Sequence, residues 1–89
     1  MNLISELSFV KRAKNRSKVL KAVDGAMMPS ELVLKLYSKS SNTYFNIVSR
    51  ALGELVQQKL VRVVNPKSKT GRLYTLTDKG KRVVNLLGK

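Results

Sequence analysis

The chain has 89 residues, the length of one small domain, with 18 Lys and Arg against 5 Asp and Glu, and hence a formal net charge of +13. It contains no cysteine and no histidine, which excludes disulfides, thiolate or imidazole metal sites, and catalysis by either side chain. No Gly-rich phosphate loop is present and the carboxylates are scattered along the sequence, so we expect neither an enzyme nor a cofactor.

The excess of positive charge predicts a polyanionic partner, and we favour nucleic acid. A basic surface also suits an acidic membrane or an acidic protein, and it can serve solubility alone. No apolar run approaches the roughly 18 residues of a membrane-spanning helix, and neither a lipidation motif nor a secretory signal is evident. We therefore expect a cytoplasmic, nucleoid-associated protein that binds no membrane.

The N-terminal part of the chain shows a helical spacing of apolar side chains up to a stop at Asp24-Gly25, which fits one helix or two short ones. Basic residues interleave with them, and a solvated helix face accounts for some of these whatever the function. We expect Lys14, Arg16 and Lys18 to contact DNA phosphates. The apolar positions are Leu3, Leu7, Val10, Ala13, Val19, Leu20 and Val23.

The next helix is expected from Pro29 to about Tyr37, because proline suits the first helical position, where its missing N–H has no intrahelical partner. Serine or threonine at position 28 would form a capping box with Glu31, but Met28 stands there, so either Ser30 caps the helix or the cap is weak. The polar residues that follow form a turn. The inward-facing positions of this helix are Leu32, Val33 and Leu36.

A longer amphipathic helix is predicted for residues 42 to 58. Its outward stripe has side chains that suit base edges: Asn pairs with adenine, Arg with guanine, and an Ile or Thr methyl meets the thymine methyl. We expect the stripe to contact DNA bases; its members are Thr43, Asn46, Ile47 and Arg50. The inward face, which packs on the two preceding helices, comprises Phe45, Val48, Leu52, Leu55 and Val56.

The neighbours of this stripe extend the expected DNA contact. Asn42 and Ser49 lie at its margins and should reach the DNA backbone, while Tyr44 lies between core and surface and suits either role. A polar face that merely meets solvent, as every amphipathic helix has, is the alternative. The scarcity of acid favours DNA, because Glu54 is the helix's only carboxylate and we expect it to lie away from the DNA groove.

Residues 60 to 64 and 72 to 76 are short strand-like runs joined by a turn at 65 to 71, so they predict an antiparallel hairpin. Lys67, Lys69 and Arg72 are expected to reach DNA phosphates or the minor groove, a contribution that weakens as salt rises. A solvated hairpin tip whose lysines block edge-to-edge pairing is the alternative.

Thr77-Asp78 should cap a closing helix that either packs on the other helices or forms part of a dimer contact. Its apolar positions are Val83, Val84, Leu86 and Leu87.

This order of elements predicts an α+β fold, a winged helix-turn-helix with a mainly helical three-helix core, a C-terminal β-hairpin wing and a closing helix. We expect one domain over residues 1–89, in which 1–13 form an N-terminal helical extension and 14–89 the core. The expected partner is double-stranded DNA, with helix 42–58 in the major groove and wing 65–71 on the backbone.

Four segments resemble the small winged-helix transcriptional regulators of archaea and bacteria, the broad group that includes the ArsR-like and MarR-like families. They are Met-Pro-Ser-Glu-Leu (28–32), Val-Ser-Arg-Ala-Leu-Gly-Glu-Leu (48–55), Lys-Leu-Val (59–61) and Gly-Arg-Leu-Tyr-Thr-Leu-Thr-Asp-Lys-Gly (71–80). The resemblance implies a homodimer that binds operator DNA with sequence specificity.

The chain departs from that group in two places. The turn before the reading helix is longer than usual, and Lys59 stands where the family often has glycine. Metal sensing, known in some ArsR-like members, is not implied, since this chain lacks Cys and His. A winged-helix module for protein–protein interaction, or an RNA-binding or nucleoid-type protein, is the alternative function.

Overall fold

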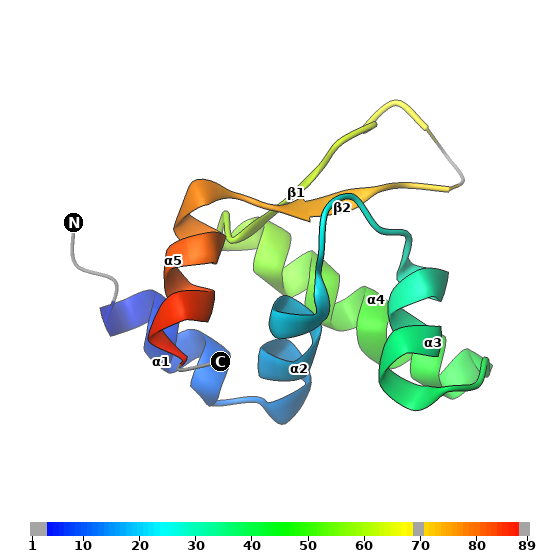
Figure 1. Cartoon of the computed structure of the whole chain (residues 1–89), viewed down its shortest axis with the longest axis horizontal. Coiled ribbons are helices and arrows are strands. Elements are labelled where there is room, and N and C mark those ends of the chain that lie inside the picture. The colour runs from blue at the N-terminus through cyan, green and yellow to red at the C-terminus, as the bar shows by residue number, and fades with distance from the viewer. Residues whose placement is uncertain (1–3, 69–70, 88–89) are drawn as a thin grey trace.

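The computed structural model describes residues 4–68 and 71–87, so Leu3 and Lys69 lie outside the described residues. Within this part of the chain, five helices and one two-stranded antiparallel hairpin form a small α+β domain (Figure 1). In chain order the elements are α1 (Ile4–Lys11), α2 (Lys14–Ala22), α3 (Pro29–Tyr37), α4 (Asn42–Gln57), β1 (Val61–Val63), β2 (Tyr74–Leu76) and α5 (Asp78–Leu86).

The N-terminal segment forms two short helices and not one long helix; the spacing of its apolar residues allowed either arrangement. Helix α2 ends at Ala22, two residues before the expected stop, because Val23 already adopts an extended backbone with φ −67° and ψ 119°. Val10 of α1 and Val19 and Leu20 of α2 are fully buried. Both helices therefore contribute to one hydrophobic core, which they share with the other three helices and β1.

Helix α3 begins after Met28, whose backbone N–H donates to the Glu31 carboxylate at 2.7 Å. Half of a capping box is thus formed although no hydroxyl is available, and Ser30 lies inside the first turn rather than at the cap. Leu32 and Val33 are buried, whereas Leu36 is half-buried. The helix ends at Tyr37, as predicted, and Ser38 follows in the left-handed conformation with φ 61°.

Helix α4 begins where the sequence predicted, and its N-terminus is capped by Ser41, whose Oγ accepts from the Tyr44 N–H at 3.2 Å. Its C-terminus closes with the N–H of Lys59 donating to Val56 O and that of Leu60 to Leu55 O. Lys59 itself has φ 62°. Lys59 therefore occupies a left-handed backbone position, of the kind that favours glycine.

The inward face of α4 is rotated by less than one residue from where the sequence suggested. Val48, Leu52 and Leu55 are buried as predicted, but Ala51 is buried with them and Phe45 is 44% exposed. Ala51 shifts the centre of the buried face, and at about 100° per residue this moves Phe45 to its edge. The inner position in the first turn belongs to Tyr44, whose ring stacks on that of Tyr37 at 4.2 Å between centroids.

Strands β1 and β2 pair in antiparallel register, with Val61 opposite Leu76 and Val63 opposite Tyr74. Both strands are shorter than predicted, and the connection between them is correspondingly longer. The Asn65 side chain braces this connection: its amide donates to Gly71 O at 3.2 Å, and its oxygen accepts from the Leu73 N–H at 2.7 Å.

Met27 adds a third segment to the hairpin, which the sequence did not predict. Its backbone exchanges two hydrogen bonds with Tyr74, of 2.9 and 2.8 Å, and forms an antiparallel bridge. The chain between α2 and α3 is thereby tied to β2.

Helix α5 is capped by Thr77, whose Oγ1 accepts from the Gly80 N–H and donates to Lys59 O. It packs on α1, α2 and β2 and buries Val83. Of the two roles that the sequence allowed for this helix, Val83 therefore takes the first, packing on the other helices. Lys79 forms an ion pair of 3.0 Å with Glu6 of α1. Leu86 remains 54% exposed.

Candidate nucleic-acid interface

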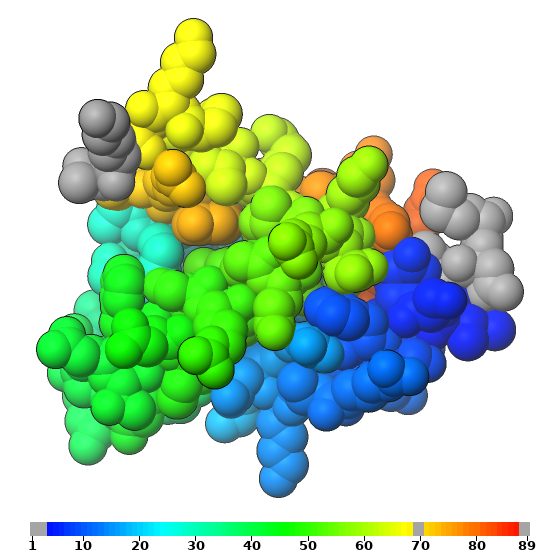
Figure 2. Space-filling view, turned by 180° about the vertical axis from the view of Figure 1, so that it is seen from behind, coloured from blue at the N-terminus to red at the C-terminus, as the bar shows by residue number. Residues whose placement is uncertain are grey.

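A groove of about 450 Å³ lies between α4 and the start of α2. From behind the view of Figure 1, α4 crosses this face of the molecule, with α1 and α2 to one side and the hairpin to the other (Figure 2). We call this hollow the α2–α4 groove. It is lined by Ala13, Asn15, Arg16, Thr43, Asn46, Ile47, Arg50, Ala51 and Glu54.

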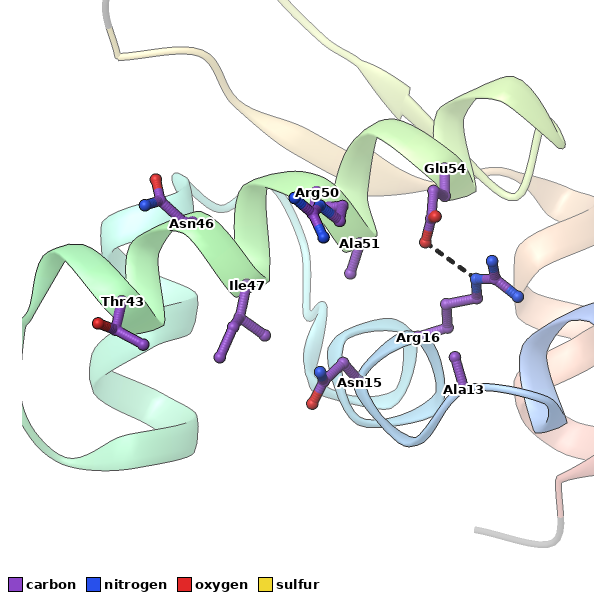
Figure 3. A pocket seen from close by; sticks show the side chains of 9 residues that line it. All are labelled: Ala13, Asn15, Arg16, Thr43, Asn46, Ile47, Arg50, Ala51 and Glu54. Atoms are coloured by element: carbon purple, nitrogen blue, oxygen red, sulfur yellow. Dashed lines mark hydrogen bonds and ion pairs between the residues drawn. The ribbon is translucent and has the colours of Figure 1, made fainter.

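All four residues of the predicted outward stripe line this groove, and we call them the reading stripe: Thr43, Asn46, Ile47 and Arg50. Three of them are exposed and Ile47 is half-buried. Figure 3 shows Ile47 pointing from α4 toward α2 and Asn46 pointing away from α2. The stripe therefore offers amide, guanidinium, hydroxyl and methyl groups on one accessible face.

Helix α2 supplies a polar residue that the sequence reasoning did not place here. Asn15, in the first turn of α2, is exposed and lines the groove opposite Ile47 (Figure 3). Nothing in the local sequence distinguishes Asn15 from other exposed polar residues. Its place beside the reading stripe follows from the packing of α2 on α4, which brings two distant segments together.

Glu54 lines the groove, although we expected it to lie away from the DNA-reading surface. Glu54 follows Ile47 by seven residues, close to two helical turns, so it points to the same side of α4. Its charge is compensated, because the Arg16 Nε donates to Glu54 Oε1 at 2.9 Å. Arg50 forms no ion pair with the described residues of this groove, although, in addition to the hydrogen bond from Arg16, its charge helps to lower the pKa of Glu54.

Arg16 is held from two further sides. One Nη donates to the carbonyl of Phe9 at 2.9 Å, and the guanidinium carbon lies 3.9 Å from the centroid of the Phe9 ring. The hydrogen bond from Arg16 lowers the pKa of Glu54, and the same bond raises the pKa of Arg16. The residue predicted to contact phosphate is thus engaged in a network that joins α1, α2 and α4.

The other predicted backbone contacts have different surroundings. Asn42 is exposed at the first position of α4, and Ser49 is half-buried. Lys67 is exposed in the hairpin connection, and Arg72 is exposed with its Nε donating to Ser68 O at 3.1 Å. Figures 1 and 2 both show this connection at the end of the molecule where α4 begins.

Lys14 and Lys18 project from α2 away from the groove. Their spacing of four residues puts them on one helix face, whereas Asn15 and Arg16, which line the groove, leave the helix at other angles. The sequence grouped Lys14, Arg16 and Lys18 as one set of phosphate contacts. The structure separates the two lysines from Arg16.

Residues 4–68 and 71–87 form neither a metal-binding cluster nor a membrane-spanning helix. This part of the chain has no group of three metal-binding side chains close enough to share an ion. None of its helices has both the length and the apolar character needed to cross a bilayer.

Comparisons of this chain with protein-family models, with characterised proteins and with solved structures found no match.

Proposed function

We propose that this protein is a winged helix-turn-helix transcriptional regulator that binds double-stranded DNA, with the reading stripe of α4 in the major groove. The observation that carries the proposal is the make-up of the α2–α4 groove. Its exposed polar groups are amides, a hydroxyl and a guanidinium, and its one carboxylate is neutralised by Arg16. Such a surface can approach a polyanion without repulsion and can donate to base edges.

The arrangement of elements supports the same class of protein. Helix α2, the Met27 bridge, α3, α4 and the hairpin follow one another in the order that a winged helix requires, with the bridge as the short first strand. Under this proposal α3 and α4 are the helix-turn-helix, residues 38–41 are its turn, and the connection between β1 and β2 is the wing.

Two kinds of contact are assigned under this proposal. Asn46 and Arg50 hydrogen-bond to base edges, with the methyl groups of Ile47 and Thr43 against thymine. Lys67 and Arg72 of the wing, with Asn42 at the start of α4, bind phosphates and so fix the position of the helix without reading the sequence. The formal net charge of +13 adds a long-range attraction that is independent of sequence.

We further propose that two copies act together on DNA. A single module of this size contacts too few base pairs for selective binding, and two-fold related copies would read two half-sites about one helical turn apart. A homodimer on a palindromic operator is the expected complex.

A selection from random duplexes tests the proposal directly. The full chain is incubated with a pool of double-stranded oligonucleotides, and the bound fraction is amplified and sequenced over several rounds. A palindromic consensus is expected. Recovery of unselected sequences, or stronger binding to RNA than to DNA at several salt concentrations, would contradict sequence-specific duplex recognition.

A further inference from the structure

A second cationic surface lies on the other side of α2 from the groove. Four lysines from the end of α1 and from α2 surround an open hollow of about 380 Å³, together with Ser17 and Leu87. We call this surface the lysine face. Its lysines are Lys11, Lys14, Lys18 and Lys21, all of them exposed.

These lysines are largely uncompensated. Among the described residues, no carboxylate lines the hollow, and Lys11, Lys14 and Lys21 make no hydrogen bond or ion pair. Lys18 lies 5.7 Å from the centroid of the Tyr37 ring, which leaves its charge unpaired. Four like charges gathered without a counter-charge from the described residues disfavour the free state and favour a bound anion.

Some other cations of the described chain are engaged within the fold, whereas others, such as Arg50 and Lys67, form no ion pair there but do not line this hollow. Arg16 pairs with Glu54, Lys79 pairs with Glu6, and the Lys35 ammonium donates to Ala22 O at 2.6 Å. The four lysines differ from these other cations because they line one hollow together. The gathering of unpaired charge on one side of α2 is therefore a local property of the structure.

The geometry also separates the lysine face from the proposed reading surface. The two hollows share no lining residue, and the lysines of α2 recur at four- and three-residue intervals, which keeps them on one face. In Figure 1 the C-terminal end of α5 lies beside the connection from α1 to α2, away from the hairpin. A rigid duplex lying along α4 would leave this face open.

We infer that the lysine face binds the sugar-phosphate backbone of a second DNA segment, so that one protein molecule bridges two duplexes. This inference rests on the proposed function, since the first duplex occupies the reading stripe. Lysine ammonium groups are mobile point charges that suit phosphates. Among the described residues, Ser17 and Leu87 alone lie beside them in the hollow, so the lysines would bind backbone without reading the sequence.

The test is a capture assay with two matched variants of the full chain. One duplex is immobilised, a second duplex carries a label, and the label retained in the presence of protein is measured. Lys11→Gln with Lys21→Gln removes two charges from the lysine face. Lys81→Gln with Arg82→Gln removes two exposed charges from α5 and is the control.

We expect the wild type and the α5 control to retain the labelled duplex, and the lysine-face variant to retain it about fivefold to tenfold less. Binding of the lysine-face variant to a single duplex should stay within about twofold of the wild type, because that contact uses α4 and the wing. This combination of results would support a second DNA-binding surface.

Four outcomes would overturn the inference. If the lysine-face variant retains as much labelled duplex as the wild type, bridging depends on another surface, for example on the two reading stripes of a dimer. Equal loss of capture and of single-duplex binding would place the lysines on the first duplex. If the wild type binds a single duplex but does not capture a second one, the protein does not bridge duplexes. If the lysines are needed for binding to vesicles of phosphatidylserine and phosphatidylcholine, and no duplex is captured, the lysine face binds anionic lipid. Failure of the wild type to bind any duplex would instead refute the proposed function itself.

Discussion

Arg50 and Lys67 represent the two kinds of contact in the proposed complex. Arg50 lines the groove on α4, whereas Lys67 is exposed in the hairpin connection. We expect Arg50→Ala to weaken binding to the selected site by about 1–3 kcal/mol and to relax the base preference at one position. Lys67→Ala should weaken all duplexes alike and lower the slope of log K against log salt by about one.

Titrations of both variants on the selected site and on a scrambled duplex measure the difference. Both side chains are exposed, so neither variant should lose its fold. If Arg50→Ala weakens specific and scrambled DNA equally, Arg50 contacts phosphate rather than a base.

Gly80 shows how closely α5 approaches the start of β1. A Cβ at this position would overlap the carbonyl oxygen of Leu60, a backbone atom that already accepts from the Thr77 N–H at 3.1 Å. Gly80→Ala should therefore lower the free energy of unfolding by on the order of 3 kcal/mol. Urea unfolding followed by circular dichroism measures this change.

Gly53→Ala provides the matched control for this substitution. A Cβ at Gly53 meets no atom within 4 Å, and the position is exposed inside α4. Alanine there should raise the free energy of unfolding by about 0.5–1 kcal/mol, because it is a better helix former. A similar effect for both substitutions would contradict the close approach of α5 to Leu60.

At the scale of elements, two ion pairs tie helices together: Arg16 with Glu54 joins α2 to α4, and Lys79 with Glu6 joins α5 to α1. The hydrogen bonds from Arg16 and Lys79 hold the pKa values of Glu54 and Glu6 below the ordinary value of 4.5. A carboxyl with a lowered folded pKa stabilises the protein above its unfolded pKa, and this contribution is lost as pH falls through the folded pKa.

We therefore expect stability to fall below about pH 4.5 and this fall to be smaller in Glu6→Gln with Glu54→Gln. Urea unfolding at about pH 7 and about pH 3 measures it. Asp24→Asn is the control, because the Asp24 carboxylate forms no ion pair within the described part of the chain. A pH dependence unchanged in the double variant would mean that neither pair couples to folding.

For the whole molecule, the net charge of +13 opposes folding and, under the proposed function, favours DNA binding. Sodium chloride should therefore raise the free energy of unfolding, since it screens self-repulsion, while it weakens the complex with duplex DNA. Thermal unfolding and DNA titration over the same salt series measure the two trends. Stability that falls with salt would show that attractive pairs outweigh the general repulsion.

Local rules accounted for most of the elements. The hydrophobic spacing and the polar residues before Asn42 predicted the start of α4, where Ser41 forms the cap. Thr77 predicted the start of α5, and Pro29 that of α3. The reading stripe was also predictable, because a helix of known start presents residues at a fixed angular spacing.

Interactions between distant segments were not predictable in this way. The Met27 bridge to Tyr74 spans much of the chain, and the exposure of Phe45 depends on how Ala51 and Tyr44 pack. The sequence showed Glu54 as the only carboxylate in α4, but it could not show that its partner is Arg16, which lies 38 residues away. A sequence pattern that covers only a few residues does not identify contacts between such distant segments.

The sequence by itself determined the charge, the starts of α3, α4 and α5, the existence of a hairpin and the four-residue stripe on the outer side of α4. Each of these depends on composition or on chain-local geometry. Only the tertiary structure decided which of those outer residues share a groove and that Asn15 lies beside them. It also decided that Arg16 pairs with Glu54, and that Lys14 and Lys18 line a different hollow. The physical reason is that α2 meets α4 through the side chains of a common core, and the direction in which α2 presents its cations is fixed by that packing and not by its own sequence.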